Sequence, residues 1–157
     1  MAYDALLWLL VIFSGIAVGA GLYEARINVP RWFARDAGSA MGVNVDAIRS
    51  DDSGRRFWAC VTTVPLTLLT LAGCVVAWSP ETAREKWWLA GAGVLLVERI
   101  GTFGYFIPQL LKLLHPERFT RDRAAQMART WMRLNYVRAA LAVAGWLAAL
   151  RALSLPG

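Results

Sequence analysis

The chain has few of the residues that metal and redox centres require. Its 157 residues include one histidine, His115, and two cysteines, Cys60 and Cys74. A structural zinc site takes four ligands, and a haem held by two histidines needs a second one. Cys60 and Cys74 lie fourteen positions apart on one predicted helix, so they cannot bridge each other, and no CxxC pair is present. We therefore expect no metal, no cofactor and no disulfide scaffold.

Charge is also scarce along most of the chain. Hydrophobic residues make up 57% of the sequence, charged residues only 18%, and the mean hydropathy is +0.43. About 20 apolar residues are needed to cross a bilayer as a helix. Four runs have roughly this length: Ala5–Tyr23, Phe57–Trp78, Trp87–Pro108 and Trp131–Leu150. No basic residue precedes the first run, so we interpret it as a retained helix rather than a cleaved signal peptide.

These runs predict an all-α fold, an integral membrane four-helix bundle in a single domain. The expected spans cover about residues 5–26, 57–78, 87–108 and 129–150. The long link from Ile27 to Gly54 is either a lid over the bundle or an unstructured connection. The basic, amphipathic segment Leu110–Trp131 is typical of a helix lying on the membrane surface before the fourth span.

Basic residues are distributed unevenly between the links. Outside the spans, the first and third links carry twelve Lys and Arg residues, whereas the second link and the C-terminus carry three. The positive-inside rule then predicts that both long links are cytoplasmic and both termini are outside. The formal net charge of +6 is explained by this bias and by contact with anionic lipids, so we expect membrane lipids and no nucleic acid as partners.

Polar residues inside the third and fourth spans fall on one helix face each. Glu98, Thr102, Tyr105 and Gln109 follow helical spacing in the third span, as do Trp131, Asn135 and Arg138 in the fourth. A charge at the bilayer centre costs roughly 2.5–3.5 kcal/mol, so both faces should point into protein. Counting the rise along each helix places Glu98 and Arg138 at similar depth, which predicts an ion pair between them. Glu24, at the inner end of the first span, either reaches the headgroups or joins this cluster.

Four segments of the chain carry a resemblance to a known family. They read GLYEARINVPRW, SGRRFWACVTTVPLTLLTL, ERIGTFGYFIPQLLKL and WMRLNYVRAAL, with the patterns ER-x-x-T-x-x-Y-F-x-P and W-x-x-x-N-x-x-R. Across nearly its whole length the chain resembles small bacterial members of the anthrone-oxygenase-like family of four-span membrane proteins. The resemblance implies a four-helix bundle in the bacterial inner membrane. For the few members given a role, it implies cofactor-free oxygenation of an aromatic anthrone to an anthraquinone.

Such a reaction needs a base, a cation that holds the resulting anion, and a dry pocket that admits oxygen. The candidate base is Glu98 or Tyr105, and the candidate anion holder is Arg138 or Arg99. The other candidate ligand-binding and wall residues are Glu24, Thr102, Phe103, Phe106, Trp131, Asn135 and Tyr136.

Three functions stay open on the sequence. The first is an enzyme acting on a lipophilic aromatic molecule. The second is a proton-coupled transporter or binder of small molecules, either as a monomer or as a homo-oligomer. The third is a structural membrane protein with an internal ion pair. An open cavity around Glu98 and Arg138 would favour the first two, and a cavity closed at the outer face would favour the enzyme over the transporter.

Overall fold

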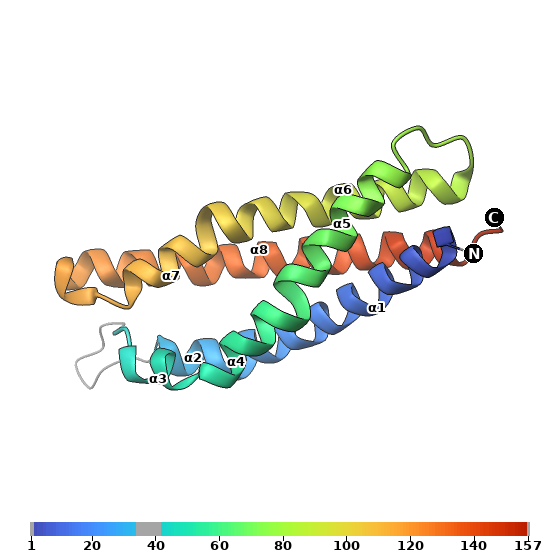
Figure 1. Cartoon of the computed structure of the whole chain (residues 1–157). Helices are drawn as coiled ribbons and strands as arrows, with labels where there is room; N and C mark the ends of the chain where they lie inside the picture. Colours follow the sequence, from blue (N-terminus) through green and yellow to red (C-terminus); the bar gives the residue numbers. More distant parts are fainter. Residues whose placement is uncertain (1, 34–41, 157) are drawn as a thin grey trace.

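The computed structural model describes residues 2–33 and 42–156, and this part of the chain forms helices and turns without a strand. Four stretches are long and apolar enough to cross a membrane, as predicted: Tyr3–Trp32, Trp58–Val76, Ala83–Leu113 and Arg121–Leu153. Both termini and the link between the second and third stretches lie at one end of the bundle, the terminus end (Figure 1). The other links lie at the opposite end, the loop end (Figure 1).

Three of the four stretches change their helical period part-way along. The elements, in chain order, are α1 (Ala2–Tyr23), η1 (Glu24–Asn28), α2 (Val29–Trp32), α3 (Val45–Ser50), α4 (Asp52–Phe57), η2 (Trp58–Thr63), α5 (Val64–Val76), α6 (Ala83–Gly101), η3 (Thr102–Phe106), α7 (Ile107–Leu113), η4 (Pro116–Arg118) and α8 (Arg121–Leu153). The segments η1, η2 and η3 are π-helical, and η4 is a turn of 3₁₀ helix. Only α8 runs its whole length as an uninterrupted α-helix.

A proline explains each π-helical segment. Pro30, Pro65 and Pro108 each stand two residues after the end of a π segment. Proline has no N–H, and its ring clashes with the carbonyl four residues before it, so the helix must open there. In each case the residue just before the proline donates its N–H to the carbonyl five residues earlier, the π-helical hydrogen bond.

The segment Leu110–Trp131, predicted to lie on the membrane surface as one helix, is divided between α7, η4 and α8. Its first residues extend α7 to Leu113, and its later residues, from Arg121, begin α8. Pro116 opens the 3₁₀ turn between them, and Thr120 caps α8 by accepting a hydrogen bond from the Arg123 N–H at 3.4 Å. The prediction of a separate interfacial helix was therefore wrong, because the turn chemistry lies in the middle of the amphipathic segment.

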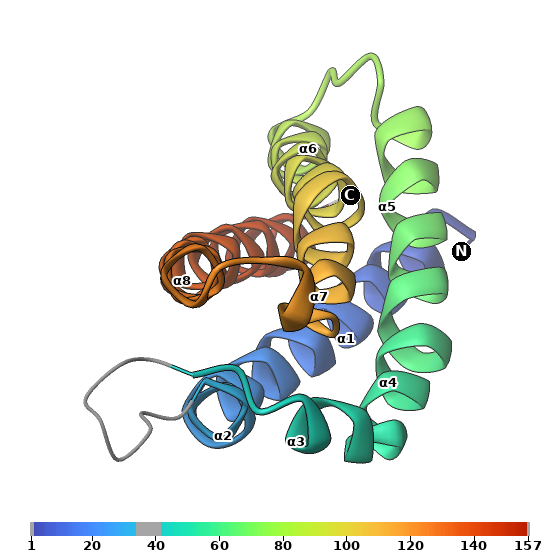
Figure 2. The same cartoon turned by 90° about the vertical axis from the view of Figure 1, so that its left-hand side faces the viewer.

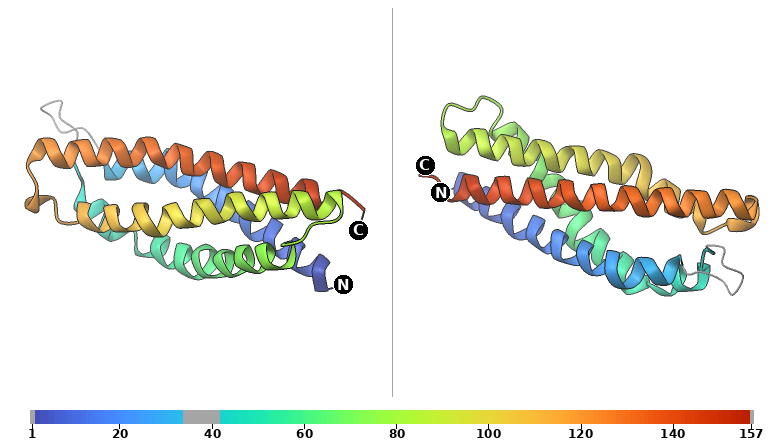
Figure 3. Two further views of the ribbon diagram at one scale, coloured as in Figure 1. Left: turned by 90° about the horizontal axis from the view of Figure 1, so that it is seen from above. Right: turned by 180° about the vertical axis from the view of Figure 1, so that it is seen from behind.

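The half of the bundle next to the terminus end is closely packed. Its core includes Leu7, Leu10, Leu66, Trp88 and Leu95. The helices α6 and α8 lie side by side along their length (Figure 3). They approach closely at two glycines: a Cβ added at Gly91 would lie 3.0 Å from the backbone nitrogen of Ala149 and from the carbonyl oxygen of Gly145.

The helices separate toward the loop end. There α7 lies beside α8 and apart from α4 and α5 (Figure 2). A second core cluster fills the loop end and includes Trp32, Ile48, Phe106, Leu113 and Trp131. Ile48 belongs to α3, within the predicted Ile27–Gly54 link, so part of that link packs onto the bundle. Residues 34–41 of the link are outside the described residues.

Candidate functional site

A cavity of about 330 Å³ lies between the two core clusters, where the helices separate. All four long apolar stretches and α3 contribute to its wall. The lining is mostly apolar and includes Ala17, Val18, Leu22, Ile107, Leu110, Leu111, Ala139 and Ala142. The polar and aromatic residues that line it are Glu24, Trp32, Asp51, Trp58, Thr63, Glu98, Arg99, Thr102, Phe106, Trp131, Asn135 and Arg138. A largely apolar cavity with a few polar groups is the usual form of a small-molecule site.

Glu24 and Arg138 meet across the cavity from the first and fourth stretches. One Glu24 oxygen accepts a hydrogen bond from Trp58 Nε1 at 2.9 Å, and the other lies 3.5 Å from Arg138 Nη2. Glu24 is therefore part of the buried cluster, which decides between the two positions open on the sequence. A separation of 3.5 Å is long for a hydrogen bond, so the ion pair leaves most of the guanidinium donors unsatisfied by Glu24.

The prediction of an ion pair between Glu98 and Arg138 was wrong. Both Glu98 oxygens are engaged within its own helix, one by Arg99 and the other by Thr102 Oγ1 at 2.9 Å. Arg138 is paired with Glu24 instead. Matching depths along two helices did not identify the partner, because the adjacent Arg99 is long enough to fold back onto Glu98. Glu98 and Arg138 still line the same cavity.

Phe106 and Trp131 form the aromatic wall beside Arg138. The guanidinium carbon of Arg138 lies 4.9 Å from the centre of the Phe106 ring, within the range of a cation–π contact. Trp131 donates its indole N–H to the Phe106 carbonyl at 3.2 Å, and the two rings meet edge to face with centroids 5.7 Å apart. These contacts fix the orientation of both rings and hold the guanidinium at the cavity surface.

Asn135 also lines the cavity, and it is only 4% exposed. Among the described residues its Oδ1 has no hydrogen-bond partner. Leaving a buried polar atom unpaired costs about 1–3 kcal/mol. Asn135 precedes Arg138 by three positions on α8, so the two side chains share a helix face. Together they present an unpaired acceptor and several donors to one apolar cavity.

Three aromatic residues expected in the site lie outside the cavity. Tyr105 packs on the Phe106 ring and belongs to the loop-end cluster, while Phe103 and Tyr136 are 47% and 62% exposed. The π segment η3 explains why Tyr105 lies outside the cavity. A π turn adds a residue, so the face that starts at Glu98 and Thr102 continues through Phe106 and Leu110 rather than Tyr105 and Gln109.

Trp58 is the main site residue that the sequence reasoning missed. It lies at the start of η2, and its indole N–H donates to Glu24 inside the bundle. A signal was present in the sequence. Each of three spans contains a β-branched residue followed by proline, at Val29-Pro30, Val64-Pro65 and Ile107-Pro108, and each pair marks a π segment that lines the cavity.

The described residues contain no group of three or more His, Cys, Asp or Glu side chains arranged to hold a metal ion. Comparison of the chain with protein-family models, with curated proteins and with solved structures found no match. A function is therefore inferred from the chemistry of the cavity.

Proposed function

We propose that the chain is a multi-pass protein of the bacterial inner membrane that binds a lipophilic small molecule in the cavity between its core clusters. Four apolar helical stretches support the membrane location. The excess of basic residues in the links at the loop end supports a cytoplasmic position for that end, with both termini outside.

The observation that carries the binding proposal is the unpaired Oδ1 of Asn135 beside the under-used donors of Arg138, within an apolar cavity. A structural ion pair would be expected in a tightly packed interior with its donors and acceptors matched. Here the polar groups face empty space of ligand size. Binding is thus better supported than a purely structural role.

Transport is less well supported than binding or catalysis. A transporter needs access to its site from both sides of the membrane in alternation. The terminus half of the bundle is filled by its core cluster, in which Leu10, Trp88 and Leu95 are almost fully buried. The close approach of α6 and α8 at Gly91 and Gly145 holds this half shut.

Binding can be tested with the fluorescent phenol 2-naphthol and protein reconstituted in nanodiscs. We expect saturable binding to the wild type, and a loss of at least tenfold in affinity for Asn135→Leu and for Arg138→Gln. Gln109→Leu is the matched control, because the amide oxygen of Gln109 is also buried without a partner among the described residues, on a neighbouring helix, but Gln109 does not line the cavity. Equal binding by the wild type and both cavity variants would refute the proposal.

If the protein is an enzyme, the reaction we propose is the cofactor-free oxygenation expected from the family resemblance. A base removes a proton from the activated carbon of an anthrone, and the carbanion reacts with molecular oxygen. One oxygen atom becomes the new carbonyl of the anthraquinone and the other leaves as water. Tyr105 does not line the cavity, and both Glu98 oxygens are held within its own helix by Arg99 and Thr102. Glu24 replaces them in the proposal because, within the described ranges, one of its oxygens has only the long 3.5 Å contact with Arg138, which is the anion holder.

This reaction is tested with anthrone itself, measured as anthraquinone formation and oxygen consumption above the rate in empty nanodiscs. We expect Glu24→Gln to lower the rate by about 10²–10⁴-fold, the usual contribution of a general base. An unchanged rate in Glu24→Gln would exclude Glu24 as the base. If anthraquinone forms no faster than in empty nanodiscs, the enzymatic proposal is refuted. The binding proposal is then tested by the 2-naphthol assay alone.

A further inference from the structure

The terminus end of the cavity is closed and most of its loop end is covered, and this raises the question of how a ligand enters. Toward the terminus end the core around Trp88 blocks it. Toward the loop end Trp32, Ile48 and Leu113, each at most 6% exposed, cover most of it, and the half-buried Asp51 and Leu114 line the remainder. The helix α3 that carries Ile48 is held in place by hydrogen bonds from Asn44 N to the Trp32 carbonyl at 2.8 Å and from Arg49 Nη2 to the Leu114 carbonyl at 3.5 Å.

The sides of the cavity are different, because several lining residues are also exposed on the outer surface of the bundle. Between η2 and α7 these are Ala59, Ile107 and Leu111, the last two 40% and 57% exposed. The two elements are well separated (Figure 2). All three side chains are apolar, as expected for a surface in contact with hydrocarbon. We call this the η2–α7 opening.

A second opening lies between α1 and α8. Leu22 lines the cavity and is 51% exposed, and across from it Ala139 and Ala142 are half-buried. Leu22 follows Gly15 by seven positions, so it lies on the same face of α1, and Gly15 packs against Trp146 of α8. Beyond this contact, toward the loop end, small alanines rather than a tryptophan line the cavity together with Leu22. We call this the α1–α8 opening.

From these features we infer that the cavity receives its ligand sideways from the hydrocarbon phase, through the η2–α7 and α1–α8 openings, and that the ligand is a membrane-dissolved lipophile carrying a hydroxyl group. This inference rests on the proposed binding function. The openings face the region of the bundle surface that is apolar, whereas the polar groups of Asn135, Arg138 and Glu24 lie inside. A molecule already dissolved in the bilayer reaches them without crossing water.

The polar atoms of Asn135 and Arg138 that lack a partner indicate that the ligand carries a hydroxyl group. The Asn135 acceptor needs a donor, and the Arg138 guanidinium needs an acceptor. A hydroxyl supplies both from a single oxygen, and it costs far less to bring into hydrocarbon than a charged group does. A carboxylate or phosphate would satisfy Arg138 but would leave Asn135 Oδ1 unpaired and would lie near the carboxylates of Glu24 and Glu98.

The route can be tested by chemical labelling of Glu24, whose carboxyl group lines the cavity. Dicyclohexylcarbodiimide dissolves in bilayers; the carboxyl O–H adds across its C=N bond, and an acyl shift to nitrogen leaves a stable acylurea that mass spectrometry can locate. A carbodiimide carrying a quaternary ammonium group undergoes the same reaction from water. In liposomes we expect the lipid-soluble reagent to label Glu24 at least tenfold faster than the charged reagent, and Glu24→Gln to remove that label.

Variants that block the openings provide the second arm. Ala59→Trp narrows the η2–α7 opening and Ala142→Trp narrows the α1–α8 opening. We expect the double variant to lower labelling by dicyclohexylcarbodiimide at least tenfold. Leu68→Trp is the matched control, because Leu68 is on α5, is 63% exposed and does not line the cavity; its labelling should equal that of the wild type.

Two results would overturn the inference: equally fast labelling of Glu24 by the charged reagent in the wild type, or unchanged labelling by the lipid-soluble reagent in the double variant with a wild-type melting profile. The first comparison needs no variant, so it stands even if the double variant does not fold. Absence of 2-naphthol binding together with lipid-side labelling would overturn the binding proposal alone. Naphthol binding together with water-side labelling would overturn the lateral route alone.

Discussion

The two halves of the bundle are built from the same four stretches, yet they pack in different ways. In the terminus half the stretches are plain α-helices, and small residues let α6 and α8 touch. In the loop half three stretches pass through π segments, and the helices separate around a cavity. Helix association in a membrane depends on packing rather than on burial from water, so loss of close packing has to be offset by polar contacts.

The polar residues are distributed accordingly. Glu24, Glu98, Arg99, Asn135 and Arg138 all lie at the cavity, whereas the terminus-half core is apolar apart from small hydroxyl side chains such as Ser14 and Thr70. Both hydroxyls donate to a carbonyl four residues earlier in their own helix. The indole N–H groups of Trp88 and Trp146 are also buried in this half without a partner in the described part of the chain, but they face packed side chains rather than a cavity. In the open half an unpaired amide oxygen and several charged groups line a cavity, and this combination identifies the open half as the site.

The largest effects should come from breaking the ion pair that crosses the open half. Arg138→Gln leaves the buried Glu24 carboxylate without its cation, which should lower the free energy of unfolding by about 3 kcal/mol. Combined with Glu24→Gln, the loss should be smaller than the sum of the single losses by about 1–3 kcal/mol. The measurement is a double-mutant cycle by detergent-induced unfolding in mixed micelles.

The Glu98 and Arg138 pair is the matched control for this cycle. Because Glu98 is bound by Arg99 and Thr102, the effects of Glu98→Gln and Arg138→Gln should add to within about 0.5 kcal/mol. A stronger coupling of Arg138 to Glu98 than to Glu24 would restore the pairing that the sequence predicts.

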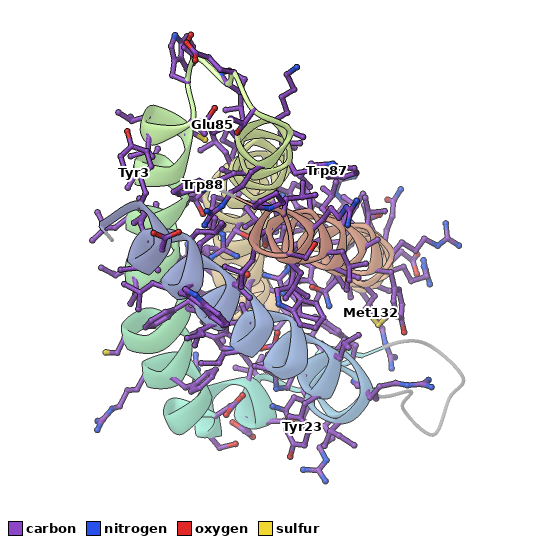
Figure 4. All side chains as sticks on the ribbon, turned by 90° about the vertical axis from the view of Figure 1, so that its right-hand side faces the viewer. Tyr3, Tyr23, Glu85, Trp87, Trp88 and Met132 are labelled. Atoms are coloured by element: carbon purple, nitrogen blue, oxygen red, sulfur yellow. The ribbon has the colours of Figure 1, made fainter. Side chains whose placement is uncertain are left out.

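The closed half can be tested by removing its largest core side chain. Trp88 is 2% exposed and packs edge to face on Tyr3 with ring centroids 6.2 Å apart, whereas the adjacent Trp87 is 46% exposed. The two side chains point to different sides of α6 (Figure 4). Trp88→Ala should cost about 3 kcal/mol through the void it leaves, and Trp87→Ala less than about 0.5 kcal/mol. Thermal unfolding in nanodiscs measures both, and equal losses would show that this half is not closely packed.

The difference between the two halves also explains which features of the fold and the site could be predicted from the sequence. Four long apolar helices, their order and the burial of Glu98, Thr102 and Asn135 follow from apolar length and from the spacing of polar residues. Those inferences depend only on the cost of placing polar groups in lipid. The pairing of charges does not follow, because depth along a helix leaves the side-chain direction undetermined. The change of register at Tyr105 was missed because a constant period of 3.6 residues was assumed from Glu98 through Pro108 to Gln109.

The smallest expected effect tests that change of period directly. With an uninterrupted α-helix Tyr105 would face the cavity, whereas η3 places Phe106 there, against Arg138. Phe106→Leu should therefore weaken 2-naphthol binding about fivefold, equivalent to the cation–π contact of about 1 kcal/mol that positions the guanidinium. Tyr105→Phe, which removes only a hydroxyl outside the cavity, should change the affinity by less than about twofold, within the roughly 0.5 kcal/mol typical of changes away from a site. If Tyr105→Phe weakened binding more than Phe106→Leu, the tyrosine hydroxyl would have to reach the ligand, and the π-helical register of the third span would be wrong.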